Sequence, residues 1–377
     1  MKFPDGPLDM TDTFPTEILL DVFGRLACHP DALYNAIRVC KDWEDAGTAI
    51  TWHTVNSELL DGIPLERRQH YAVKIFDLSC PADKQMLVRT GGLSFPRLNS
   101  LQITLQQINN ERAQPSEIRG VQPIQAMENL LDLMPARMPR LRHVVLHGQP
   151  DDWKMVQEFF MKIDNLQSVE ISNPVGMSTT IADSLVGHFS QRPSFFSLKG
   201  PIPVTENAVQ RASQSYATYF SQLRELEMVA SAATVSIFSK IAQDLRSLRV
   251  NLEGPLEEVF KSVSALHNLE HLVLCIQTSL SNGIPTFTKD DFKHLQTMHK
   301  LRHLEVVVRN RRVPLPRAHS LKDEDFGLLF YNLRSLKYFY MECDNRLTSK
   351  TLDYINELCP HLTACWYGPD SVKGWII

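Results

Sequence analysis

Apolar residues recur along this chain in one short pattern from residue 98 almost to the C-terminal end. An apolar residue is followed by two others, a second apolar residue, one other residue and a third apolar residue. Eight stretches hold the full pattern and two, marked here, hold a degenerate form: Leu98/Leu101/Ile103, Leu141/Val144/Leu146, Leu166/Val169/Ile171, Phe195/Leu198/Gly200 (degenerate), Leu223/Leu226/Met228, Leu245/Leu248/Val250, Leu269/Leu272/Leu274, Leu301/Leu304/Val306, Leu336/Phe339/Met341 and Leu362/Cys365/Tyr367 (degenerate). Apolar residues two positions apart are typical of a strand with one buried face. Each recurrence therefore predicts a short strand.

Segments with helical spacing lie between these strand patterns. Val156, Phe159 and Phe160 fall on one face of a helix, and residues 124–134 show the same spacing. Further helices are expected over 208–220, 235–242, 256–263, 290–295, 323–330 and 350–358. The sequence therefore predicts that strand and helix alternate from about residue 98 onward.

The spacing of the strand patterns indicates a repeat. Successive patterns start between 22 residues (Leu223 to Leu245) and 43 residues (Leu98 to Leu141) apart. One strand and one helix recurring at about 20–29 residues resemble a leucine-rich repeat. Such units stack into an α/β solenoid, with a parallel sheet on the concave face and helices on the convex face. Three longer intervals hold insertions that we expect to form rim loops, at 106–122, 279–288 and 309–320.

A doubly wound α/β domain is the alternative, because it also alternates strands and helices. Its nucleotide-binding versions carry a glycine-rich turn after the first strand. This chain holds neither G-x-G-x-x-G nor G-x-x-x-x-G-K-[ST]. The sequence therefore favours the solenoid.

The first fifty residues follow a different pattern. Three apolar stripes at helical spacing occupy them: Ile18/Leu19/Val22/Phe23/Leu26, Leu33/Ala36/Ile37/Cys40 and Val39/Trp43/Ala46/Ile50. Pro15 is suited to the start of the first helix, where no backbone N–H is needed. Three short helices bury too little apolar surface to be stable alone. We therefore expect this block to pack against a partner or against the rest of the chain.

Several short motifs of this block, in this order, resemble the F-box. They are Phe14-Pro15-Thr16-Glu17-Ile18-Leu19, Val22-Phe23, Leu26, Val39-Cys40-Lys41-Asp42-Trp43 and Trp52-His53-Thr54-Val55. The family pattern has leucine where this chain has Phe14. Together with the repeats that follow, the chain resembles F-box leucine-rich-repeat proteins, and its irregular repeats are similar to the large fungal set of these proteins.

This resemblance implies a substrate-recognition subunit of an SCF-type, cullin-RING ubiquitin ligase, without catalytic residues of its own. In that family the F-box docks onto a Skp-family adaptor, the adaptor joins a cullin scaffold, and the repeats hold a protein substrate. The positions that map onto the adaptor-facing surface are Phe14, Pro15, Ile18, Leu19, Val39, Cys40 and Trp43. For Leu19 and Trp43, a place in the internal core of the block is an open alternative. The implied organisation is a flexible N-terminus (1–10), an F-box (11–56), a linker (57–70) and the solenoid (71–377).

Composition and charge narrow the classes of partner. Lysine and arginine number 39 against 43 aspartate and glutamate residues, which gives a formal net charge of -4. A balance this even gives no general attraction to nucleic acid or to anionic lipid, and no run of about 18 apolar residues predicts a membrane span. The seven cysteines have no paired spacing and no Asn-x-Ser/Thr site occurs, which favours an intracellular location, cytoplasmic or nuclear.

Candidate substrate contacts follow from the strand period. The residues that flank the second and third apolar positions are expected to point out of the concave face. They are His143, His147, Glu225, Glu227, Arg249, Asn251, His271, His303, Glu305, Arg309, Tyr338, Tyr340, Glu342 and Trp366. Tyrosine and tryptophan on a rigid surface often dominate binding energy. We therefore predict contacts from Tyr338, Tyr340 and Trp366, with His303, Glu305 and Arg309 beside them. The alternative is an exposed strand surface without a binding role, since tyrosine favours strands in any case.

A basic run follows the strand pattern at Val306. It consists of Arg309, Arg311, Arg312 and Arg317, with Pro314 and Pro316 stiffening the segment. Guanidinium groups pair with phosphate and carboxylate, so this loop would fit an acidic or phosphorylated segment. A solvated loop is the alternative.

The motifs of enzymes and metal sites are missing from the sequence. His143 and His147 are four residues apart in a strand pattern, where this spacing does not bring them together. Cys359, His361 and Cys365 lack the second pair that a zinc site needs. We therefore predict no catalytic residue, metal or cofactor. Three hypotheses stay open: a ubiquitin-ligase receptor, an F-box interaction protein that acts outside ubiquitin transfer, and an enzyme whose groups converge on the concave face.

Overall fold

The computed structural model describes residues 15–81, 89–105, 136–150, 152–215, 220–254, 256, 258–277, 284–309, 315–344, 347–359, 361–366 and 375–376. The chain folds into two compact units, Met1–Arg142 and His143–Ile377. The predicted flexible N-terminus, Phe14, the predicted helix at 124–134 and the insertion at 106–122 lie outside the described residues.

The first unit begins with three helices and continues with short strands. Its elements are α1 (Thr16–Leu26), α2 (Pro30–Ile37), α3 (Lys41–Thr51), β1 (Thr54–Asn56), the 3-10 helix η1 (Ser57–Gly62), α4 (Leu65–Ala72), β2 (Asp77–Pro81) and β3 (Ser100–Thr104). The strands β1, β2 and β3 pair in parallel. The segment 57–70, for which the sequence predicts a linker, contains η1 and most of α4.

The three helices have a small core of their own, built from the predicted stripes. Leu19, Phe23, Leu33 and Ala46 are buried in it. The Trp43 ring packs edge-on against Phe23, with ring centroids 5.5 Å apart and an interplanar angle of 79°. The apolar spacing of the first fifty residues therefore predicted these helices, but only part of each predicted stripe faces the core, since Ile18, Val22 and Val39 are exposed.

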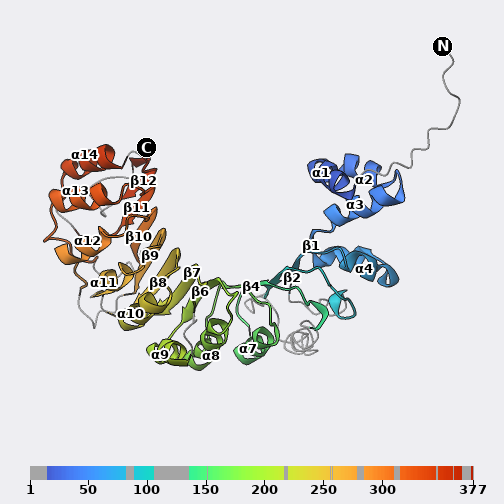
Figure 1. Ribbon diagram of the computed structural model, residues 1–377, viewed down its shortest axis with the longest axis horizontal. Helices are drawn as coiled ribbons and strands as arrows, with labels where there is room; N and C mark the ends of the chain where they lie inside the picture. Colours follow the sequence, from blue (N-terminus) through green and yellow to red (C-terminus); the bar gives the residue numbers. More distant parts are fainter. Residues whose placement is uncertain are drawn as a thin grey trace, which may run out of the picture. The chain divides into compact units, whose positions relative to one another are not determined.

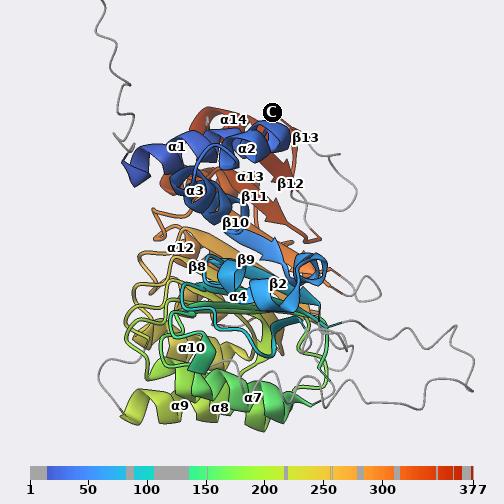
Figure 2. The same ribbon diagram turned by 90° about the vertical axis from the view of Figure 1, so that its right-hand side faces the viewer.

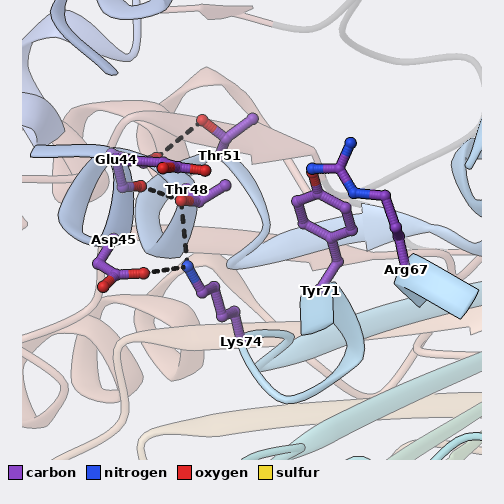
Figure 3. Close-up of polar contacts among 8 residues, drawn as sticks. Glu44, Asp45, Thr48, Thr51, Arg67, Tyr71 and Lys74 are labelled. Atoms are coloured by element: carbon purple, nitrogen blue, oxygen red, sulfur yellow. Dashed lines mark hydrogen bonds and ion pairs between the residues drawn. The ribbon is translucent and has the colours of Figure 1, made fainter. Parts of the chain in front are cut away.

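A buried lysine joins α3 to the turn after α4. The Nζ atom of Lys74 donates to the Asp45 carboxylate at 3.2 Å and to the Thr48 hydroxyl at 3.1 Å (Figure 3). The lysine side chain is only 11% exposed, so these two partners replace most of the water around its ammonium group. Nearby, Tyr71 stacks on Trp52 with a centroid distance of 4.6 Å. The three-helix block is thus attached to the following elements of its own unit by polar and aromatic contacts.

The second unit alternates strands and helices. Its elements are β4 (His143–His147), α7 (Trp153–Lys162), β5 (Ser168–Ile171), α8 (Thr179–Ser190), β6 (Ser197–Pro203), α9 (Glu206–Ser215), β7 (Glu225–Ala230), α10 (Ala232–Ile241), β8 (Ser247–Glu253), α11 (Val259–Val263), β9 (His271–Gln277), α12 (Lys289–Leu295), β10 (His303–Val308), α13 (Asp323–Asn332), β11 (Tyr338–Met341), α14 (Ser349–Leu358), β12 (Ala364–Trp366) and β13 (Trp375–Ile376).

The strands of the second unit form one sheet in chain order. Strands β4 to β12 pair in parallel with their neighbours in sequence, and β13 pairs antiparallel to β12. The helices α7 to α14 lie on the outer side of this curved sheet, and its other face is the inner one (Figure 1). The helices α7, α8 and α9 lie side by side (Figure 2). The second unit is therefore an α/β solenoid of leucine-rich-repeat type, which is the predicted fold class.

Hydrogen bonds from threonines at helix N-termini link neighbouring repeats. Thr348, the N-cap of α14, donates its backbone N–H and its hydroxyl to Asp323 of α13, at 2.9 and 2.6 Å. The Thr351 hydroxyl donates to the same carboxylate at 2.5 Å. Thr205, just before α9, makes the same pair of bonds to Asp183 of α8 at 3.2 and 2.6 Å. Each of these two carboxylates satisfies donors at the next helix start.

Asp323→Asn is expected to lower the free energy of unfolding by about 1 kcal/mol at pH 7, since an amide is a weaker acceptor than a carboxylate. Burial raises the pKa of Asp323, but the hydrogen bonds from Thr348 and Thr351 outweigh it, so this pKa lies below its ordinary value. The carboxylate therefore stabilises the fold above its unfolded pKa, and this contribution is lost as pH falls through the folded pKa.

Urea unfolding followed by circular dichroism between pH 7 and pH 3 measures this effect. The difference between wild type and variant is expected to narrow below about pH 4. Asp353→Asn, at an exposed carboxylate on α14, is the matched control and is expected to change little. A difference that stays constant down to pH 3 would contradict the assignment.

Candidate functional site

The three-helix block exposes an apolar set of side chains. Ile18 is 49% exposed, Val22 42%, Tyr34 63% and Val39 63%. Ile18 and Val22 are one turn apart on α1, so their side chains are neighbours. Among the described residues, eleven large apolar side chains are exposed, and four of them lie in this small block. The block therefore keeps part of its apolar surface outside its own core.

The predicted adaptor contacts divide between this surface and the core. Pro15 and Cys40 are exposed, like Ile18 and Val39. Leu19 is 5% exposed and belongs to the internal core, the alternative that the sequence left open for it. Trp43 is half-buried against Phe23, so part of its ring belongs to the same core.

Sequence reasoning did not select Tyr34 as a site residue, although it is 63% exposed. The sequence pattern could have indicated Tyr34 as a surface residue, because it lies outside the apolar stripe that runs through Leu33 and Ile37. An aromatic residue off the buried face of an amphipathic helix indicates a surface role, and the guanidinium of Arg38 lies 5.6 Å from the Tyr34 ring centroid.

On the second unit, three aromatic rings line up across adjacent strands of the inner face. His271, His303 and Tyr338 pair in register on β9, β10 and β11. The rings of His303 and Tyr338 stack with centroids 4.3 Å apart, and those of His271 and His303 are 5.8 Å apart. The sheet thus presents a continuous aromatic surface at this position.

Carboxylates flank the tyrosines of β11. The Tyr340 hydroxyl donates to Oε1 of Glu342 at 2.7 Å, and the backbone N–H of Val308 donates to Oε2 at the same distance. Glu305 lies in register with Tyr340, and its Oε2 atom is 3.2 Å from Nε2 of His303. Four of the six predicted inner-face contacts, namely His303, Glu305, Tyr338 and Tyr340, therefore lie next to one another.

The local electrostatics agree with this arrangement. Burial, and then the hydrogen bond to the Glu342 carboxylate, raise the pKa of Tyr340. Burial, and then the charge of Glu305, raise the pKa of Tyr338. Burial is the main cause that lowers the pKa of His271, which favours a neutral imidazole at pH 7. The two tyrosine hydroxyls are therefore neutral at physiological pH and lie in a region of negative potential.

The other predicted contacts are more dispersed. Arg309 is exposed at the end of β10, where its backbone N–H donates to the carbonyl of Ile276 at 3.2 Å. Trp366 pairs in register with Tyr340, and its side chain lies outside the described part. Arg317 is exposed, and Arg311 and Arg312 lie outside the described residues.

One inner-face position differs from the prediction. The strand period predicts that Asn251 points outward and is exposed, but its side chain is fully buried. The period sets which face a side chain belongs to, whereas burial depends on the neighbouring strands. The register partner on β9, Cys275, is also buried, and this stretch of the inner face is covered.

The described part of the chain holds no group of three or more histidine, cysteine, aspartate or glutamate residues that could hold a metal ion. Burial raises the pKa of the Cys359 thiol to about 11, and its Sγ donates to the carbonyls of Phe330 and Leu333. This thiol is therefore protonated at neutral pH and contributes to the core. None of the helices in the described residues has the length and hydrophobicity that crossing a bilayer requires.

Comparisons with protein-family models and with curated protein sequences give no match. Several solved structures match over most of the chain. The yeast Rad7 and Elc1 complex matches at 12% identity, over 89% of this chain and 90% of that chain, with a TM-score of 0.43. A protein of Bacteroides fragilis matches at 11% identity, over 85% and 74% of the two chains, with a TM-score of 0.25. The Toll–Spatzle complex of Drosophila matches at 12% identity, over 80% and 47%, with a TM-score of 0.30. Similarities at this level carry no argument for function.

Proposed function

We propose that this chain is a non-catalytic, intracellular substrate-recognition subunit of an SCF-type ubiquitin ligase. Its three-helix block is an F-box that docks onto a Skp-family adaptor, which links the chain to a cullin scaffold. Its repeats hold a protein substrate. The observation that carries this proposal is the exposure of Ile18 and Val39, apolar residues at F-box motif positions that the block itself leaves uncovered.

The energetics favour a partner for the block. Its own core consists of four buried side chains with a few partly buried neighbours, which is little for three helices. Covering one exposed valine or isoleucine side chain contributes about 1.5–3 kcal/mol when burial is complete. An adaptor that buries the exposed apolar set would therefore gain binding energy and stabilise the block.

In this proposal the solenoid holds the side chains that bind the substrate in fixed positions. Its parallel strands hold the inner-face side chains at fixed register, so little conformational entropy is lost when a partner binds. Holding a substrate lysine near a charged thioester makes the transfer effectively intramolecular. Recognition and proximity are then the whole contribution of this chain, and the chemistry belongs to other subunits.

Co-expression with a Skp-family adaptor followed by size-exclusion chromatography tests the docking step. The native chain is expected to elute as a stoichiometric complex. Ile18→Asp combined with Val39→Asp is expected to weaken adaptor binding by about 100-fold, because two charges are placed in an apolar interface. Leu59→Asp, at a side chain that is 59% exposed on η1, is the matched control and is expected to keep the complex.

Two outcomes would count against the proposal. A native chain that is folded by circular dichroism but elutes without the adaptor would show that the block is not a docking module. If the double variant binds as tightly as wild type, the apolar set is not the docking surface. Cullin association in cells then separates a ligase receptor from an F-box interaction protein that acts outside ubiquitin transfer.

A further inference from the structure

Four residues form a row across the inner face of the solenoid. Asn251 on β8 pairs in register with Cys275 on β9, which pairs with Val307 on β10. Glu342, directly after β11, continues the row, because its N–H donates to the carbonyl of Val306 at 2.8 Å. We call Asn251, Cys275, Val307 and Glu342 the cross-strand row.

At the β8 end of this row lies a polar side chain without partners. Both Nδ2 and Oδ1 of Asn251 lack a hydrogen bond, and the residue is fully buried. Its neighbours Val250 and Leu252 belong to the core side, so the strand period places the Asn251 side chain on the inner face. A buried polar group without a partner costs about 1–3 kcal/mol. One donor beside one acceptor is the complement of a peptide group.

At the β11 end lie two carboxylates and two tyrosines. Glu342 is held by the Tyr340 hydroxyl and by a backbone N–H, and Glu305 contacts His303. Within the described residues, no lysine or arginine forms an ion pair with either carboxylate. An aromatic ring beside a carboxylate that no lysine or arginine neutralises is a site for a lysine or arginine side chain.

The charges around the row favour its β11 end for a basic side chain. Arg249 and Arg309 act electrostatically on the Cys275 thiol, and so does the Glu305 carboxylate of β10. Arg249 is 3.7 Å from the carboxylate of Glu227, and Arg309 is exposed. A basic side chain is therefore attracted to the β11 end, where the carboxylates of Glu305 and Glu342 lie.

We propose that the cross-strand row binds an extended segment of a protein partner, with one peptide group on Asn251 and a lysine or arginine side chain between Glu305, Glu342 and the tyrosines of β11. This deepens the proposed function, on which it rests, by naming the substrate class as a basic segment. Three strand spacings separate Asn251 from Glu342, about 14 Å, which an extended chain spans in about four residues. Asn251 is fully buried in the free chain, so binding of a peptide group there includes its uncovering.

Panning of phage-displayed random octapeptides on the full chain tests this inference. The selected peptides are expected to share one lysine or arginine at a fixed position. A synthetic peptide of the selected sequence, measured by fluorescence anisotropy, is expected to bind at least tenfold more weakly to Glu342→Gln. Replacing its basic residue by norleucine is expected to cause a similar loss. Glu253→Gln, at an exposed carboxylate of β8, is the matched control and is expected to bind as wild type.

The variant Asn251→Leu distinguishes a role of Asn251 in peptide binding from a role in the stability of the fold. It removes two unpaired polar atoms from a buried position, so the midpoint of thermal unfolding is expected to stay or rise. Binding of the selected peptide is expected to fall about tenfold. A purely structural asparagine would instead lower the unfolding midpoint and leave peptide binding unchanged.

The inference is overturned if no peptide is enriched, if the enriched peptides lack a basic residue, or if Glu342→Gln and Asn251→Leu both bind the selected peptide as wild type does. Adaptor binding is measured on the same samples. Loss of peptide binding with an intact adaptor complex overturns this inference alone, whereas loss of the adaptor complex in the native chain concerns the docking of the three-helix block.

Discussion

Phe330→Ala is expected to lower the free energy of unfolding of the second unit by about 3–5 kcal/mol, since it empties the centre of a packed aromatic cluster. Phe330 is fully buried on α13. Its ring packs edge-on against Phe339 of β11, with centroids 5.1 Å apart and an interplanar angle of 80°. Phe326, one turn earlier, contacts both rings at 6.4 Å. The variant therefore loses buried apolar area together with two aromatic contacts.

Leu328→Ala on the same helix is the control, because Leu328 is 56% exposed and its removal leaves no cavity. We expect it to change the unfolding free energy by less than about 0.5 kcal/mol. Urea unfolding followed by circular dichroism at 222 nm compares the two variants. A Phe330→Ala effect as small as that of Leu328→Ala would mean that this cluster is not packed as described.

The repeat architecture was predictable because its signals are local. Two-residue alternation marks one-sided strands and helical spacing marks one-sided helices, and both periods are properties of neighbouring residues. In β7 the residues Leu226, Met228 and Ala230 are buried while their neighbours are half-buried, as the pattern requires. The same reasoning predicted the helices of the three-helix block, but not which residues of each apolar stripe form its core.

The strands β1 and β2 were harder to predict, because they depart from the leucine pattern. Ile75, Leu78 and Cys80 are all buried in or beside β2 and occupy the three apolar positions of a repeat. Cysteine takes the place of the third leucine, since a buried thiol behaves as a small apolar group. The strand patterns read from the sequence begin at residue 98 and do not include this segment.

The sequence predicted on which face of the sheet the candidate site residues lie, but not how deeply each of them is buried. Tyr338, Tyr340 and Glu305 follow from the strand period, which fixes the side of the sheet. Asn251 is buried together with its register partner Cys275, a strand away and 24 residues further on (251 to 275), and no local pattern reports such a pairing. In the same way, spacing along α1 could not decide which apolar residues its two partner helices cover.

Gly200→Ala is expected to lower the free energy of unfolding by about 3 kcal/mol, since both the backbone and the available space exclude a side chain there. Gly200 has a φ of 125°, which L-residues rarely adopt. A Cβ built on it overlaps the carbonyl oxygen of Ile171, a backbone atom of β5 that has no flexible end to move. The glycine lies where the register between β6 and β7 shifts, between Leu198 and Ile202.

Gly187→Ala is the control for Gly200→Ala, and it is not expected to lower the free energy of unfolding. Gly187 is in α8, and a Cβ built on it meets no atom within 4 Å. Alanine favours a helix over glycine by about 1 kcal/mol, so this variant is expected to be as stable as wild type or more stable.

Because each repeat contacts mainly its neighbours, the Gly200→Ala defect is expected to open the repeats around β6 first. Amide hydrogen exchange measures this, with faster exchange expected at β5, β6 and β7. Uniform exchange across the second unit, or an unfolding free energy equal to that of Gly187→Ala, would contradict the role assigned to Gly200.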